Sequence, residues 1–85
     1  MGVRPVVTLY GRPGCHLCDE AEAELRRLAP RLGFELQLVN IEADDELHRR
    51  YLYEIPVVAL GDMEIAKAPI RGKALEDRLT ELLSG

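Results

Sequence analysis

The chain has no tryptophan, a single phenylalanine and three tyrosines, and it has no excess of positive charge. Its 15 acidic residues outnumber its 11 lysines and arginines, for a formal net charge of −4 at pH 7. Proteins that bind nucleic acids usually concentrate basic residues on one face and offer aromatic rings for base stacking. The composition therefore argues against nucleic-acid binding and favours a soluble protein.

Long apolar runs are also missing from the sequence. No stretch approaches the ~20 apolar residues that a membrane-spanning helix requires. Residues 1–5 lead directly into a strand-like pattern, without the charged and apolar segments of a secretory signal. Gly2 is not followed by the Ser or Thr that a myristoylation signal needs. We therefore expect a cytoplasmic protein that makes no contact with a membrane.

Cysteine is scarce, with two in a chain of 85 residues. A secreted domain held by disulfides would carry more, and in a reducing compartment a close cysteine pair is typical of catalysis or metal binding. The length predicts a single domain spanning residues 1–85, and the 47% hydrophobic fraction is ordinary for a globular protein. We expect a monomer.

Hydrophobic periodicity predicts alternating strands and helices along the chain. The strands are expected at residues 3–10, 34–41, 57–60 and 63–67, and the helices at residues 15–29, 44–52 and 71–83. Pro30 should end or kink the first helix near Ala29, and Asp44 should cap the second. Gly61 and Asp62 are typical of a two-residue hairpin turn. The order βαβαββα predicts an α/β fold in which three helices flank a mixed four-stranded sheet.

The chemistry-bearing motif is the pair Cys15 and Cys18, which stands where a strand and a turn give way to a helix. At such a junction of a βαβ unit, a close cysteine pair is a strong indication of redox chemistry. The first helical turn has free N–H groups, so we expect Cys15 to ionise more readily than a free thiol, with help from the charge of Arg12. Cys18 lies one helical turn further on and should be more buried. The pattern predicts Cys15 as the nucleophile and Cys18 as the resolving thiol.

Two segments of the sequence resemble a known family. Residues 10–18, with the sequence Tyr-Gly-Arg-Pro-Gly-Cys-His-Leu-Cys, resemble the active-site segment of glutaredoxins, and Ile55-Pro56-Val57 is similar to their cis-proline motif. With the element order, the chain resembles the glutaredoxin branch of the thioredoxin-fold superfamily, in particular small bacterial glutaredoxin-like proteins with Cys-His-Leu-Cys. This resemblance implies a thioredoxin fold over nearly the whole chain.

The resemblance also implies roles for individual residues. Pro56 would be cis and face Cys15, the backbone of Ile55 would pair with the substrate chain, and Arg12 would hold a glutathione carboxylate. His16 stands where glutaredoxins commonly have proline, and a cationic imidazole there would stabilise the Cys15 thiolate and make the pair more oxidising.

A second departure from the family pattern concerns glutathione. The glycine pair and the following acidic residue of glutaredoxins are replaced by Ile-Ala-Lys-Ala-Pro at residues 65–69, so the usual glutathione pose is not implied. The resemblance therefore implies a thiol–disulfide oxidoreductase without a resident cofactor. Its substrate would be a disulfide-containing protein or a small thiol, and its electron donor glutathione or a protein disulfide reductase.

Three alternatives stay open at the level of the sequence. The domain would be a thioredoxin-like reductase fed by a protein reductant, a metal-binding protein, or a non-catalytic thioredoxin-fold module. In the metal-binding alternative, Cys15 and Cys18 would ligate zinc with His16 or His48, or two chains would share an iron–sulfur cluster. A structural zinc site usually takes four protein ligands, and His16 is expected on a different helix face from the cysteines. We expect no bound metal.

Overall fold

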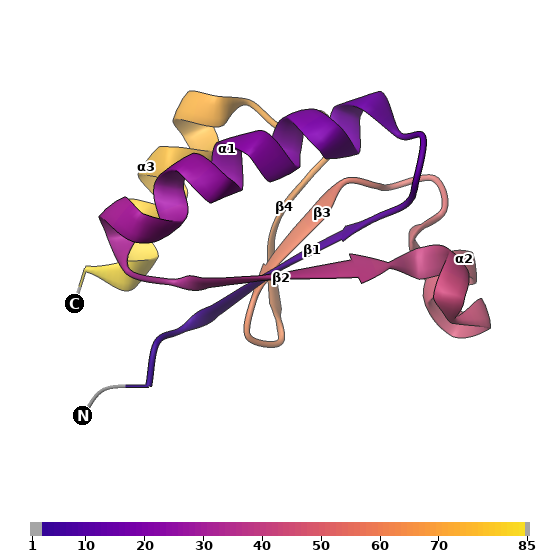
Figure 1. Ribbon diagram of the computed structural model, residues 1–85, viewed down its shortest axis with the longest axis horizontal. Helices are drawn as coiled ribbons and strands as arrows, with labels where there is room; N and C mark the ends of the chain where they lie inside the picture. Colours follow the sequence, from indigo (N-terminus) through magenta and orange to yellow (C-terminus); the bar gives the residue numbers. More distant parts are fainter. Residues whose placement is uncertain (1–2, 85) are drawn as a thin grey trace.

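The computed structural model describes residues 3–84, which form one four-stranded sheet and three α-helices (Figure 1). The elements in chain order are β1 (Val6–Gly11), α1 (His16–Leu32), β2 (Glu35–Asn40), the 3₁₀ helix η1 (Ile41–Ala43), α2 (Asp45–Tyr51), β3 (Val57–Leu60), β4 (Met63–Lys67) and α3 (Gly72–Leu83). The predicted order βαβαββα and the α/β class are confirmed.

The sheet has the strand order β2-β1-β3-β4, so β1 and β3 lie inside it and β2 and β4 form its edges. Strand β1 runs parallel to β2 and antiparallel to β3, and β3 and β4 form an antiparallel hairpin. The nearly continuous apolar character of the first strand follows from this inner position, where Val7, Thr8 and Leu9 are all buried. The predicted mixed sheet is therefore confirmed.

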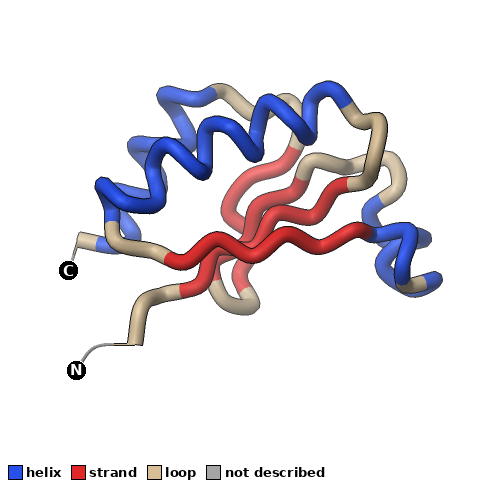
Figure 2. The backbone as a smooth tube through the Cα atoms, viewed as in Figure 1, coloured by secondary structure: helices blue, strands red, loops and turns tan. Residues whose placement is uncertain are grey.

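The main core lies between the sheet and helices α1 and α3, which pack beside each other over one face (Figure 2). Its buried side chains are Val7, Leu9, Ala21, Leu25, Leu28, Phe34, Val58, Leu75 and Leu79. The residues from α1 are spaced by four and three positions, which places them on one helix face. Because only residues 12–15 connect β1 to α1, this packing holds the first turn of α1 at the carboxyl end of β1.

The expectation that Pro30 ends the first helix near Ala29 is wrong, because α1 continues through Pro30 to Leu32, whereas a kink at Pro30 stays a prediction. Pro30 has no N–H group to donate to the carbonyl oxygen four residues earlier, so α1 lacks one hydrogen bond. Pro30 lies on the exposed side of α1, where water can reach that unpaired carbonyl oxygen. Gly33 ends the helix instead, with φ 78°, in the left-handed conformation typical of a helix C-cap. The N–H groups of Gly33 and Phe34 both donate to the Ala29 carbonyl oxygen, at 2.9 and 3.2 Å.

The short helix α2 begins as predicted. The Asp44 Oδ1 atom accepts hydrogen bonds from the N–H groups of Glu46 and Leu47, at 2.9 and 3.0 Å. The preceding strand stops at Asn40 rather than at Ile41, because Ile41 turns inward as the first residue of η1 and is fully buried. In Figure 1 this places α2 beyond the end of β2, at the same end of the molecule as the start of α1.

The second half of the chain closely follows the expectation. The hairpin pairs Leu60 with Met63, and Gly61 takes φ 58° at the first turn position, where a two-residue hairpin turn requires it. The first strand, in contrast, begins at Val6 and not at residue 3. Within residues 3–84, no helix is both long and apolar enough to cross a membrane.

Candidate active site

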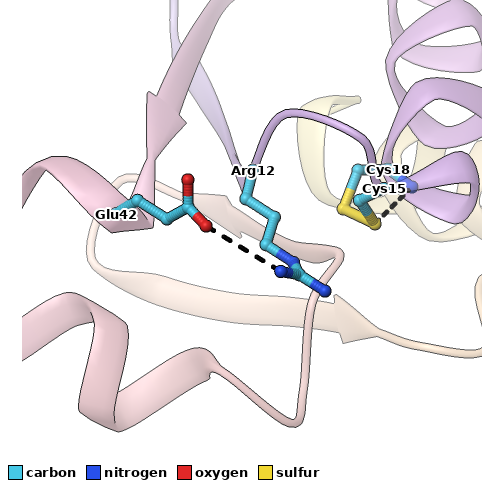
Figure 3. The surroundings of a disulfide bond; sticks show 4 residues. All are labelled: Arg12, Cys15, Cys18 and Glu42. Atoms are coloured by element: carbon cyan, nitrogen blue, oxygen red, sulfur yellow. Dashed lines mark hydrogen bonds and ion pairs between the residues drawn. A yellow bond between two sulfur atoms is a disulfide. The ribbon is translucent and has the colours of Figure 1, made fainter.

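Cys15 is the N-cap residue of α1 and is joined to Cys18 by a disulfide bond (Figure 3). Its extended backbone, with φ −94° and ψ 106°, turns the Sγ atom back over the first helical turn, where it accepts a hydrogen bond from the Cys18 N–H at 3.1 Å. The two Cα atoms are 5.2 Å apart, within the usual range for a disulfide. The positions of the two Cα atoms therefore suit a disulfide between Cys15 and Cys18.

The two cysteines differ in exposure. Cys18 is 5% exposed, whereas Cys15 is half-buried at the molecular surface. This is the asymmetry that the sequence predicts, with one sulfur accessible to a partner and the other held behind it.

Gly11 belongs to the segment of residues 10–18, but its spacing in the sequence predicts no particular role for it in the site. It is the last residue of β1, it is buried, and a Cβ atom at this position would lie 3.1 Å from both the Cβ and the Sγ of Cys18. Its backbone has no positive φ, so the close approach of Cys18 is what favours glycine here. Only the packing of α1 against the end of β1 identifies this role.

Arg12 follows Gly11 and is close to the redox pair along the loop. Its guanidinium group lies 3.8 Å from the Glu42 carboxylate, and both side chains are exposed to solvent (Figure 3). Arg12 also lines a cavity of about 220 Å³ that reaches Cys18 and Asp19 between α1 and β2. The role expected for Arg12 in holding glutathione stays a prediction.

The imidazole of His16 projects from the first turn of α1. Its Nε2 atom lies 2.8 Å from a Glu20 carboxylate oxygen, one helical turn further on, and the His16 side chain is 87% exposed. The expected effect of His16 on the Cys15 thiolate stays a prediction, and Glu20 is a neighbour that sequence reasoning did not single out. The four-residue spacing of His16 and Glu20 places both on one face of a helix, and this spacing is the sequence feature that predicts their contact.

The Ile55–Pro56 peptide bond is cis, as the family resemblance implied. Tyr10 is the Cα partner of Val57 across the sheet, so Pro56 enters β3 beside the end of β1 that leads to Cys15. Pro56 is buried, and the Ile55 N–H donates to the Tyr51 carbonyl oxygen at 3.1 Å. The topology thus brings this loop and the redox pair to the same end of the sheet, where β1 ends and β3 begins.

Tyr51 connects three segments at this end of the sheet. The sequence pattern places Tyr51 on the inner face of α2 but does not predict these contacts. The Tyr51 ring lies 4.8 Å from the Tyr10 ring, and its hydroxyl group donates to a Glu64 carboxylate oxygen on β4 at 2.9 Å. The pKa of Tyr51 is raised above its usual value, mainly by burial and to a smaller extent by the hydrogen bond to Glu64. Its carbonyl oxygen accepts from both Glu54 and Ile55, so Tyr51 also holds the loop before Pro56.

The metal-binding alternative finds no ligand cluster in the part of the chain that the structure describes. Across residues 3–84, no three or more His, Cys, Asp and Glu side chains are grouped as metal ligands. His16 instead contacts Glu20, and His48 lies half-buried on α2.

Comparisons with known proteins agree with this arrangement. Residues 6–80 match the family model described as Glutaredoxin-like domain (DUF836). The fold is similar to the solution structure of protein Ne2328 from Nitrosomonas europaea, with 32% identity over 91% of this chain and 93% of that one and a TM-score of 0.74. A protein from X. campestris is 29% identical, over 88% of this chain and 96% of its own, with a TM-score of 0.72.

A more distant comparison concerns the fold alone. Thioredoxin 1 from Thermosipho africanus is 11% identical, over 92% of this chain and 93% of its own, yet superposes with a TM-score of 0.71. The four-stranded mixed sheet with its three helices is therefore a thioredoxin fold.

Proposed function

Because this chain belongs to the glutaredoxin-like domain family, we propose that it is a thiol–disulfide oxidoreductase that reduces disulfides by dithiol exchange. The observation that carries the proposal is the Cys15–Cys18 disulfide at the start of α1, with a half-buried N-cap sulfur and a buried partner. An accessible sulfur with a second sulfur behind it suits a two-step exchange.

The exchange proceeds through a mixed disulfide. The Cys15 thiolate attacks one sulfur of the substrate disulfide, the substrate S–S bond breaks, and the other substrate sulfur leaves as a thiolate that takes up a proton. Cys18 then loses its proton and attacks the Cys15 sulfur, which forms the Cys15–Cys18 bond and releases the second substrate thiol. The substrate gains two electrons and two protons, and the chain ends as the disulfide.

The start of α1 supports Cys15 as the attacking sulfur. The Cys18 N–H already points at the Cys15 Sγ, and the first helical turn places the positive end of the helix dipole there. In the dithiol form these groups favour a negative charge on Cys15. A protonated His16 would add positive charge, and its contact with Glu20 would offset part of that effect.

The loop before β3 supports a substrate site beside the pair. Pro56 lies next to the end of β1, and the backbone of Ile55 precedes it. Since the Ile55 N–H donates to Tyr51, a substrate chain at this loop would be held through the Ile55 carbonyl oxygen. Arg12 would attract a substrate or glutathione carboxylate if it exchanges its contact with Glu42.

The electron donor in this proposal is a thiol, either glutathione or a protein disulfide reductase. Equilibration of the Cys15–Cys18 pair against glutathione buffers of known poise distinguishes them. A potential of about −200 mV suits a glutaredoxin-like cycle, and one of about −270 mV suits a thioredoxin-like reductant.

Single-cysteine variants test the mechanism. Cys15→Ser should lose all turnover with a protein disulfide, because it has no nucleophile. Cys18→Ser should accumulate a mixed disulfide between Cys15 and the substrate, detected by non-reducing electrophoresis and mass spectrometry. Normal turnover by Cys15→Ser, or trapping through Cys18 in that variant, would contradict the assignment.

A further inference from the structure

A groove whose charged lining residues are all basic lies between the edge strand β4 and helix α3. It has a volume of about 300 Å³ and an apolar floor that includes Ile65, Ile70 and Leu75. Three basic residues also line it, namely Lys67 at the end of β4, Arg71 at the N-cap of α3, and Arg78 further along the same helix. Acidic residues are absent from its described lining, although the whole chain carries a net charge of −4.

The charges of this groove are weakly compensated. The Lys67 ammonium group is 3.7 Å from Glu54, and the Arg78 guanidinium group is 3.7 Å from Glu81, both near the outer limit of an ion pair. Arg71 has no ion pair within residues 3–84. Exposed pairs of this kind contribute little, so an incoming anion competes with them easily.

The groove shares one lining residue with a smaller cavity at the first turns of α1. Ile70 lines the groove and also this cavity of about 150 Å³, which is bounded by Leu17, the residue directly before Cys18. A chain that brings a disulfide to Cys15 would pass Leu17 and Ile70 on its way to the groove. This path lies beside Glu20 and Glu24, which also line the smaller cavity.

The spacing of the cations indicates the size of the ligand. Arg71 and Arg78 are seven positions apart, which corresponds to about 10 Å along a helix. About three residues of extended polypeptide cover that distance, so Arg71 and Arg78 can each contact a separate acidic side chain of one segment. The apolar floor suits side chains that alternate with the acidic ones.

We propose that this groove binds an acidic, partly apolar segment of the polypeptide that carries the substrate disulfide. The inference rests on the proposed function and adds a substrate class to it, namely disulfides flanked by alternating acidic and apolar residues. Attraction to Lys67, Arg71 and Arg78 would raise the rate at which such substrates reach Cys15.

Reduction of matched peptides tests this substrate class. Each peptide carries one cysteine in a mixed disulfide with 2-mercaptoethanol, and one side of the cysteine carries three glutamates alternating with valines. In the neutral control peptide, glutamines replace the glutamates, and both pairs are made with the segment before or after the cysteine. The fully reduced protein should reduce the better-placed acidic peptide about five- to tenfold faster than its neutral match, since each exposed ion pair changes affinity by up to about fivefold.

Charge-removing variants locate the effect. The double variant Arg71→Gln, Arg78→Gln should lose most of the acidic preference and keep its rate with the neutral peptide. Lys73→Gln is the matched control, because Lys73 lies on the same helix with an 82% exposed side chain and pairs with Asp77 outside the groove. An equal loss with the control, or a parallel loss with the neutral peptide, would overturn the proposal.

A binding measurement separates this inference from the proposed function. The oxidised protein is titrated with the acidic segment without its cysteine, and amide shifts are followed by ¹⁵N NMR. Shifts centred on Lys67, Arg71 and Arg78 support the groove even if no exchange activity is found. Exchange activity without these shifts, or shifts that inorganic phosphate reproduces at the same concentration, would overturn the groove as a peptide site and leave the redox assignment standing.

Discussion

Cys15 and Cys18 are three residues apart, yet their surroundings differ sharply. Cys15 is reached from the surface and caps a helix, whereas Cys18 is packed against Gly11. The cysteine spacing predicts that both sulfurs meet, but it does not predict the residue behind Cys18. That contact depends on where the end of β1 lies relative to the first turn of α1.

Replacement of Gly11 by alanine should therefore destabilise the oxidised protein. The new Cβ would lie 3.1 Å from two atoms of Cys18, and relief of such overpacking costs about 1 kcal/mol. Gly72→Ala is the control, because its Cβ would meet only the carboxylate end of the Glu24 side chain, at 3.2 Å, and no backbone atom. Urea unfolding measures both, and a Gly11→Ala variant as stable as Gly72→Ala would contradict the close packing at Cys18.

Tyr51 gives the stability a pH dependence at the residue scale. Its pKa is raised in the folded protein, chiefly by burial, so its contribution is fully present below pH 10.0 and is lost as the pH rises through the folded pKa. Tyr51→Phe should lower the free energy of unfolding by about 1 kcal/mol at neutral pH, because it removes the hydrogen bond to Glu64. Urea midpoints measured from about pH 8 to about pH 11 should converge for the two proteins, and a constant gap would refute the assignment.

At the scale of elements, helix ends explain which boundaries were predictable. Asp44 caps a helix, and Gly61 forms a hairpin turn, through residues only two or three positions away. The sequence next to each residue therefore predicts these boundaries. Pro30 has an equally strong local signal, but the packing of α1 against the sheet outweighs it and carries the helix on to Gly33.

The cap of α2 should matter more than its exposure suggests. Asp44→Ala removes the acceptor for two N–H groups of a seven-residue helix, at a cost of about 1 kcal/mol. Asp44→Asn keeps an oxygen at the same place and should retain most of the stability. Urea unfolding compares the three proteins, and equal losses in both variants would show that charge, not capping, is the cause.

At the scale of the whole molecule, two buried clusters share the inner strands. Val7, Leu9 and Val58 belong to the core under α1 and α3, whereas Val57 packs with Ile41 and Tyr51 in the cluster near α2. Since β1 and β3 contribute to both, neither cluster is expected to unfold separately.

Urea unfolding of the oxidised protein should therefore be one cooperative transition. Far-UV circular dichroism, which follows the helices, and tyrosine fluorescence, which follows Tyr10 and Tyr51 among the three tyrosines, should give the same midpoint. Separate midpoints would indicate that α2 and its cluster unfold on their own. A single domain, a monomer and a cytoplasmic location stay predictions from the composition.

The sequence by itself determined that Cys15 and Cys18 meet at the start of a helix, the order of the elements and the ends that local hydrogen bonds define. These features depend on residues within about one helical turn of each other, or on periodicity within one element. Only the tertiary structure decided that Gly11 lies behind Cys18, that Tyr51 joins α2 to β1 and β4, and that Lys67, Arg71 and Arg78 line one groove. The physical reason is that the strand order and the packing of helices on the sheet decide which distant side chains meet.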